Sequence, residues 1–325
     1  MLLAIWPIRP EGFTMSIRSF LAGDEAAQVR IYNDSAAERP KFKPASLDEI
    51  RRRCSAAEFD PGSRFFAIEN GDAVGYAGFH ANGRVSFPWC AKGQERWSLP
   101  LFERVLEAMR ARNMKNAWAA YRADWTGELE FFRSQGFQQV REMVNFDLNL
   151  GDMPTPGARR ASSLSPLSAS DIPQLIKLGF GALRTSSAAE LERHWFHNPY
   201  YSSKSLFVLR SREDNSIEAV AMVIANSSYA SPKQVDPNMP CFRLGAFGAE
   251  GMQAKRMNGM FSFLAVPADA GRLGLDLLGH AAHLLMKGNV ESFAAQVPSD
   301  APHLLRFYQH HFRKQGAFPV MERLL

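Results

Sequence analysis

A glycine-containing turn near the end of the chain is the clearest place for chemistry in this sequence. Residues 266–274 read Val-Pro-Ala-Asp-Ala-Gly-Arg-Leu-Gly and lead from an apolar, strand-like segment into a helix-like one. The first amides of a helix attract anions, and glycine lets a phosphate approach the backbone without meeting a Cβ. Arg272 can hydrogen-bond a phosphate directly. We therefore predict a phosphate-binding turn over Gly271, Arg272, Leu273 and Gly274; the alternative is an ordinary tight turn that packs a helix closely on a sheet.

The elements that would position this turn occur twice along the chain, in the same order. Each half reads strand, two helices, hairpin, strand, helix, strand, helix, strand. In the first half we expect helices at 24–33, 47–57, 98–112 and 125–135, and strands at 65–69, 73–79, 85–90 and 116–121. In the second half we expect helices at 171–182, 188–195, 273–287 and 300–311, and strands at 206–209, 217–225, 261–266 and 291–297. The repetition indicates two copies of one fold.

The repeat is carried by its pattern more than by identity. Residues 101–150 align with residues 276–325 without a gap, and only a few positions such as Phe132 and Phe307 are identical. Asn70-Gly71 between two apolar runs is a strong hairpin signal in the first half. A Pro- and Gly-rich stretch at 151–162 interrupts every periodic pattern. We therefore predict an N-terminal arm at 1–15, a first domain at 16–150, a linker at 151–162 and a second domain at 163–325.

Composition excludes several classes of protein. The chain has 325 residues, of which 46% are hydrophobic and 22% charged, so a disordered chain, a coiled coil and a collagen-like rod are excluded. The sequence contains no stretch of about 18 uncharged apolar residues, so we expect no membrane span. The apolar run at its start is too short for a secretory signal. Three scattered cysteines, Cys54, Cys90 and Cys241, give neither a disulfide framework nor zinc spacing. We expect a cytoplasmic protein without a bound metal.

The net charge of +5 is compatible with anionic ligands such as nucleotides. It does not by itself indicate a nucleic-acid partner, because the Lys and Arg residues are scattered along the chain. No nucleic-acid or membrane partner is therefore expected, and the oligomeric state stays open.

The order of elements and two short motifs resemble the GNAT family, the GCN5-related N-acetyltransferases. Residues 130–137, Glu-Phe-Phe-Arg-Ser-Gln-Gly-Phe, look like the aromatic and Gly-Phe signature of that family, and residues 266–274 look like its cofactor turn. The resemblance covers nearly the whole chain after residue 15, as two tandem copies. It implies an α/β fold in which a mixed, mostly antiparallel sheet is flanked by helices.

The resemblance also implies acetyl-CoA as co-substrate and transfer of its acyl group to an amine. In the family two parallel strands splay apart and hold the pantetheine arm, which here would use the backbone of Leu264, Ala265 and Val266. In the family a tyrosine hydroxyl protonates the departing thiolate, and Tyr308 is our candidate for this role. The repeat alignment puts Phe307 in that place and Tyr308 one step round the helix, so the sequence leaves the choice open.

An amine acceptor must lose a proton before it attacks a thioester. Glu322 on the last expected strand is our candidate base, together with the histidines His303, His310 and His311, and no motif selects among them. The corresponding turn of the first half, residues 94–99, has Trp97 and Leu99 where the family has glycines. We interpret the first half as a scaffold or substrate wall rather than as a second cofactor site.

About 30 additional residues within 226–260 set the second half apart. Long loops often carry function. We hypothesise that this insertion lines the acceptor pocket and that Arg243, Lys255 or Arg256 meets an acidic group; the alternative is a surface excursion with solvated charges. For the whole chain, the alternative to an enzyme is an inactive ligand-binding or regulatory protein on the same fold.

Overall fold

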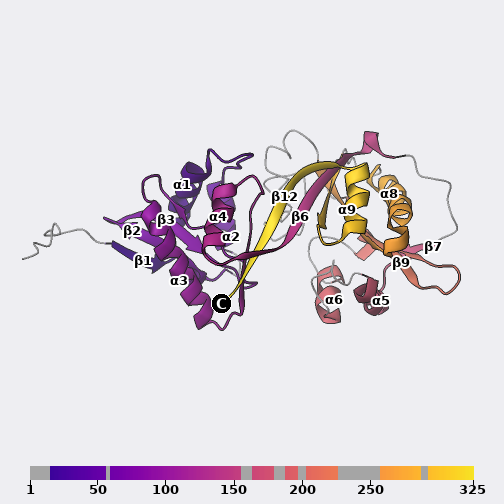
Figure 1. Cartoon of the computed structure of the whole chain (residues 1–325), viewed down its shortest axis with the longest axis horizontal. Helices are drawn as coiled ribbons and strands as arrows, with labels where there is room; N and C mark the ends of the chain where they lie inside the picture. Colours follow the sequence, from indigo (N-terminus) through magenta and orange to yellow (C-terminus); the bar gives the residue numbers. More distant parts are fainter. Residues whose placement is uncertain are drawn as a thin grey trace, which may run out of the picture. The chain divides into compact units, whose positions relative to one another are not determined.

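The computed structural model describes residues 15–55, 59–154, 163–178, 187–196, 203–225, 257–286 and 292–325. These residues belong to two compact units (Figure 1). Unit 1 comprises residues up to Val140 together with Val320–Leu325, and unit 2 comprises Arg141–Pro319. The structure thus divides the chain inside a strand rather than at the expected linker, and it assigns the last six residues to the first unit.

Unit 1 is built from a four-stranded sheet with helices on both faces. In chain order its elements are β1 (Met15–Ser19), α1 (Asp24–Ala36), α2 (Leu47–Cys54), β2 (Arg64–Glu69), β3 (Asp72–Gly78), β4 (Trp89–Cys90), α3 (Ser98–Ala111), β5 (Asn116–Ala120) and α4 (Thr126–Ser134). The sheet has the order β1-β2-β3-β4, and its neighbours pair antiparallel. The expected hairpin turn is present, with positive φ at Asn70 and Gly71.

The two faces of this sheet follow the two-residue alternation of β2. Phe65 and Ala67 pack with α3 and α4 in one hydrophobic cluster, whereas Phe66 packs with α1 in the other. Helix α2 begins after Ser46, whose hydroxyl accepts a hydrogen bond from the Glu49 amide. The expected strand at 85–90 is reduced to β4, with isolated bridges before it.

Unit 1 is completed by the end of β12 (Arg313–Leu324). Val320–Leu324 pairs antiparallel with β5, Glu322 standing opposite Trp118. Met321 is 1% exposed inside the cluster formed by α3 and α4. The first unit therefore takes one sheet strand from the end of the second repeat.

Unit 2 repeats the architecture of unit 1. Its elements are the end of β6 (Gln138–Asn149), β7 (Ser163–Pro166), α5 (Ile172–Leu178), α6 (Ala188–Phe196), β8 (Leu206–Arg210), β9 (Ile217–Ala225), β10 (Met257–Ala265), α8 (Ala270–Met286), β11 (Ser292–Pro298), α9 (Pro302–His311) and the start of β12. The sheet order is β12-β6-β11-β10-β9-β8-β7. Helices α8 and α9 cover the face that carries Phe261 and Phe263, and α5 and α6 cover the other.

Strand β6 follows the first repeat in the chain but belongs to the sheet of unit 2, where it pairs with β11 from Met143↔Pro298 to Asn149↔Ser292. The end of β12 does the reverse, because it follows the second repeat and pairs within unit 1. A fully buried carboxylate, Asp147, fixes β6 in unit 2. It accepts hydrogen bonds from Arg313, at 2.5 and 3.0 Å, and from Gln315, both on β12. A buried charge is tolerated only with such partners.

Both units fix the entry of their first helical segment with an aspartate, although the partner arginine comes from β1 in unit 1 and from β8 in unit 2. Asp24 accepts a hydrogen bond from the Leu21 amide and pairs with Arg18, and Asp171 accepts one from the Ser168 amide and pairs with Arg210. Each carboxylate thus ties the entry of the first helical segment to a strand. The ranges expected for these helices, 24–33 and 171–182, begin at the two aspartates; α1 itself is capped by Gly23 without a side-chain bond.

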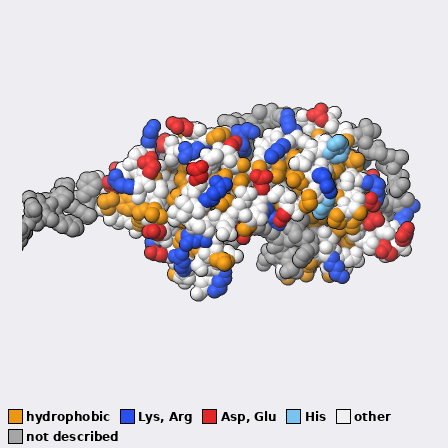
Figure 2. Space-filling view, in the orientation of Figure 1, with side chains coloured by type: hydrophobic (Ala, Val, Ile, Leu, Met, Phe, Trp, Pro, Cys, Tyr) orange, Lys and Arg blue, Asp and Glu red, His pale blue; other side chains and the backbone are white. Residues whose placement is uncertain are grey.

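No helix in the described part of the chain is long and apolar enough to cross a membrane. On the face drawn in Figure 2, Lys and Arg side chains are interspersed with Asp and Glu.

We expect the Met321→Ala substitution to destabilise unit 1, although it lies near the end of the chain. The lost packing of a fully buried side chain costs about 2–5 kcal/mol. Urea unfolding followed by tryptophan fluorescence measures it, because Trp89, Trp97, Trp118 and Trp125 lie in unit 1. Leu324→Ala on the same strand is the control: Leu324 is 80% exposed, so its truncation should stay within about 0.5 kcal/mol. Equal effects of both substitutions would contradict the packing of Met321 in the core of unit 1.

Candidate functional site

The parallel pairing of β10 with β11 is short. The two strands are in register only from Met257↔Ser292 to Met260↔Ala294. Beyond that point β10 continues beside β9, and β11 continues beside β6. The backbone of β10 after Met260 therefore has a described neighbouring strand on one side only.

The alternation of an antiparallel pair decides which backbone groups of β10 point toward β11. The Val266 amide donates to the Glu218 carbonyl at 2.9 Å, so Val266 and, two residues earlier, Leu264 direct their polar groups to β9. Phe263 and Ala265 direct theirs to the opposite edge. Of the three backbone positions that the resemblance implied, Ala265 has the required orientation. Phe263 was missed, although counting two residues back along the strand would have found it.

Tyr308 places a hydroxyl at this edge. Its side chain is 1% exposed, its ring stacks on Phe146 at 5.6 Å, and it lies 5.6 Å from the ring of Phe263. The hydroxyl is buried and has no hydrogen-bond partner among the described residues. Leaving a buried hydroxyl unpaired costs about 1–3 kcal/mol, so the Tyr308 hydroxyl retains the capacity for a hydrogen bond.

The environment of Tyr308 keeps it protonated. Burial raises the pKa of Tyr308, and the nearby Phe263 backbone N–H opposes this rise only weakly, without reaching hydrogen-bonding geometry. Phe307, the other candidate of the sequence, lies 4.8 Å from the Phe263 ring and is also buried. The structure therefore puts both aromatic side chains in the core, and only Tyr308 can donate a proton there.

The glycines of the predicted turn have different surroundings. A Cβ on Gly271 would meet nothing within 4 Å, and Gly271 is exposed at the start of α8. A Cβ on Gly274 would meet Phe307 at 2.7 Å and Phe263 at 2.8 Å. Gly274 is thus explained by close packing of α8 on two rings, which is the alternative that the sequence left open. Gly271 remains accessible to a phosphate.

Two other residues of the turn are engaged within unit 2. Arg272 forms ion pairs with Asp269 at 3.0 Å and Asp276 at 3.6 Å, so its guanidinium would have to share these partners with a phosphate. The side chain of Leu273 is fully buried in the core. The 3-10 turn Pro267–Asp269 before α8 has no side-chain cap. Pro267 has no N–H and the Asp269 amide donates to the Val266 carbonyl at 3.2 Å, so Ala268 is the residue of this turn whose amide can meet a ligand.

Unit 1 fills the corresponding places with its own side chains. The Phe87 amide donates to the Tyr121 hydroxyl at 2.6 Å, and the Gly93 amide donates to the Glu95 carboxylate at 3.0 Å. Trp97 is buried where the family has a glycine. Burial raises the pKa of the Cys90 thiol to about 11, so this cysteine carries no thiolate near neutral pH.

Glu322 belongs to unit 1, whereas Tyr308 belongs to unit 2. Arg243, Lys255 and Arg256 lie outside the described residues.

The histidines of α9 remain candidate bases in unit 2. Burial lowers the pKa of His303 and His311, with smaller contributions from Arg306 and His310 respectively. No group of three His, Cys, Asp or Glu side chains in the described segments could hold a metal ion.

Comparison by sequence finds neither a matching family model nor a matching curated protein. Comparison by structure finds similar chains. A GCN5-related N-acetyltransferase from Sphaerobacter thermophilus matches with a TM-score of 0.63 and 14% identity, over 97% of this chain and 96% of that one. A tandem GNAT protein from the clavulanic acid biosynthesis pathway matches with a TM-score of 0.53 and 12% identity, over 96% and 98%.

A third match is the GCN5-related glucosamine N-acetyltransferase region of a fungal multi-domain beta-N-acetylglucosaminidase. Its TM-score is 0.66 at 15% identity, and the match covers 95% of this chain but only 38% of that protein. At these identities the likeness establishes the fold. The chain has the GNAT fold in two tandem copies, as the sequence predicted.

We expect the four described tyrosines to ionise late in alkaline solution. Burial raises the pKa of Tyr32 to about 12 and that of Tyr76, Tyr121 and Tyr308 above its ordinary value. The unfolded chain releases these protons near pH 10, so stability should fall as the pH rises above about 10. Absorbance at 295 nm measures the step that accompanies unfolding. Tyr308→Phe should reduce that step by one phenol, and an unchanged step would contradict the burial of Tyr308.

Proposed function

We propose that unit 2 binds acetyl-CoA and transfers its acetyl group to an amine. The observation that carries the proposal is the buried hydroxyl of Tyr308, which has no described partner and lies at the edge where β10 has left β11. The GNAT fold of the neighbours named above supports the same reaction class.

The exposed backbone edge suits the pantetheine arm. Phe263 and Ala265 would hydrogen-bond its amides as an added strand does. At the end of β10, the Ala268 amide and the amides at the start of α8 around Gly271 would receive the diphosphate. The pairs of Arg272 with Asp269 and Asp276 keep this guanidinium beside the turn, where it can share its donors with a phosphate.

The reaction needs one proton donor and one proton acceptor. The amine nitrogen attacks the thioester carbonyl carbon, the C–N bond forms, and the C–S bond breaks. Backbone N–H groups facing the edge stabilise the negative charge on the carbonyl oxygen. The Tyr308 hydroxyl gives its proton to the departing sulfur, which burial permits by keeping the phenol protonated. The amine proton passes to a base, for which His303, His310 and His311 of α9 remain the candidates within unit 2.

Tyr308→Phe should lower kcat for thiol release about 10²–10⁴-fold, because one general acid typically contributes that much. The affinity for acetyl-CoA, measured by titration calorimetry, should stay the same, since the hydroxyl acts on the departing sulfur. Release of free thiol from acetyl-CoA over a panel of amines measures the rate. A wild-type protein that binds acetyl-CoA without turnover on any amine would favour the binding-protein alternative.

Gly271→Ala should separate ligand binding from stability. Alanine in a helix is up to about 1 kcal/mol more favourable than glycine, so the fold should gain stability. A Cβ at the diphosphate should nevertheless weaken acetyl-CoA binding by roughly tenfold, about the loss of one charge-assisted hydrogen bond.

Gly127→Ala is the matched control, because Gly127 is also helical, exposed and free of Cβ contacts but lies in unit 1. It should leave acetyl-CoA binding unchanged. No binding of acetyl-CoA to the wild-type chain at millimolar concentration would refute the proposed function.

A further inference from the structure

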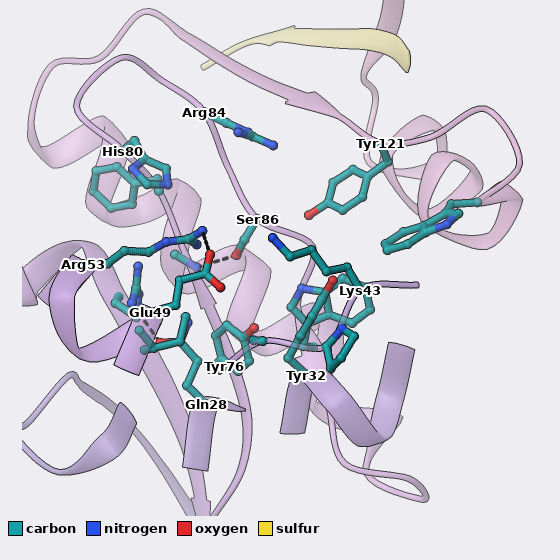
Figure 3. A pocket seen from close by; sticks show the side chains of 18 residues that line it. Gln28, Tyr32, Lys43, Glu49, Arg53, Tyr76, His80, Arg84, Ser86 and Tyr121 are labelled. Carbon is teal, nitrogen blue, oxygen red and sulfur yellow. Dashed lines mark hydrogen bonds and ion pairs between the residues drawn. The ribbon is translucent and has the colours of Figure 1, made fainter. Parts of the chain in front are cut away.

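Unit 1 contains a cavity of about 310 Å³ that the sequence did not indicate (Figure 3). It lies between α1, α2 and the end of the sheet where β3 stops and the chain turns back toward β4. All its lining residues belong to unit 1, and none comes from the 94–99 turn. It is therefore distinct from the edge described in unit 2.

The charges that line this cavity are mainly positive. Lys43, Arg53, Arg64 and Arg84 contribute cations, and Glu49 is the carboxylate among the lining residues. Glu49 is already paired with Arg53 at 2.5 Å, whereas no described carboxylate forms an ion pair with Lys43. Figure 3 shows the Lys43 amine and the Arg84 guanidinium directed into the same space as the Ser86 and Tyr121 hydroxyls. Such a concentration of donors favours an anion.

Arg64 adds a cation to the lining of the cavity. It donates to the Gln28 side-chain oxygen at 2.8 Å, reaches the Cys54 sulfur at 3.6 Å, and lies 5.2 Å from the centre of the Phe59 ring. No described carboxylate forms a salt bridge with it. Burial lowers the pKa of Arg64, which reflects the cost of a charge without a counter-ion. An anion in the cavity would supply that counter-ion.

The apolar part of the lining consists of flat rings. Trp89 meets Tyr32 edge-on at 5.1 Å and Trp125 at 6.2 Å. Trp125 is fixed by a hydrogen bond from its indole N–H to the Pro40 carbonyl at 2.9 Å. The Tyr121 hydroxyl accepts from the Phe87 amide, so its own proton is available to a ligand. Rigid aromatic walls with a few convergent donors are typical of a small-molecule site.

We propose that this cavity is a second ligand site, which binds a small planar organic oxyanion with its charge against Lys43 and Arg64 and its flat body against Trp89. The charged group is a carboxylate or a phosphate, since both accept hydrogen bonds from the same cations. The site is independent of acetyl-CoA and makes unit 1 a ligand-binding domain rather than only a scaffold.

Titration calorimetry on the full chain, without acetyl-CoA, tests the proposal with four probes that share one ring: benzoate, phenyl phosphate, benzyl alcohol and benzylammonium. We expect one of the two anions to bind once per chain at millimolar concentration or tighter. The alcohol and the ammonium compound should bind at least tenfold more weakly. The better anion identifies the charged group. Failure of both anions, or equal binding of benzylammonium, overturns the proposal.

Lys43→Ala should weaken binding of the preferred anion about 10–100-fold, the effect of losing one hydrogen bond to a charged group. Lys115→Ala, an exposed lysine of unit 1 outside the cavity, should leave that affinity unchanged. Thermal unfolding shows whether both variants remain folded. An unchanged affinity in folded Lys43→Ala would overturn the site. Gly271→Ala should not alter anion binding, so this test fails or succeeds independently of acetyl-CoA.

Discussion

The parallel pairing of β10 with β11 ends at Met260 and Ala294, and this leaves backbone groups of β10 without a described neighbouring strand on one side. The two units differ in how they satisfy such groups. A backbone amide that loses its neighbouring strand must find another partner, because a buried amide cannot stay unpaired without cost. Unit 1 meets the equivalent need internally, through the Tyr121 hydroxyl and the Glu95 carboxylate. Unit 2 brings the Tyr308 hydroxyl to its edge without a bond. At the equivalent places, unit 1 therefore satisfies its backbone amides with its own side chains, whereas unit 2 keeps a hydroxyl that can still form a hydrogen bond.

Local patterns in the sequence predicted the helices, strands and turns, because these elements depend mainly on residues that are close together in the chain. The Asn70-Gly71 hairpin and the repeated order of helices and strands follow from neighbouring residues alone. The two glycines of the α8 turn could not be distinguished in this way. What separates Gly271 from Gly274 is a pair of rings, Phe263 and Phe307, that comes from two other elements.

The rest of the architecture depends on pairings between distant segments. Nothing in the apolar pattern of β12 says that its last residues lie beside β5, or that β6 is fixed by Arg313 through Asp147. The cavity of unit 1 was missed for the same reason. Lys43, Arg64 and Arg84 come from separate segments and form no motif, and the missing glycines of the 94–99 turn indicate only a scaffold or substrate wall in place of a second cofactor site.

The position of Val320–Leu325 in unit 1 has a consequence for synthesis on the ribosome. Strand β5 emerges early, but the segment that pairs with it is made only after all of unit 2. At about 5–20 residues per second, the edge of β5 waits on the order of ten seconds or more for its partner. An open strand edge is a template for pairing with other chains. The nascent protein therefore passes through an interval in which unit 1 has an open strand edge, and this interval ends only when the segment that follows unit 2 has been made.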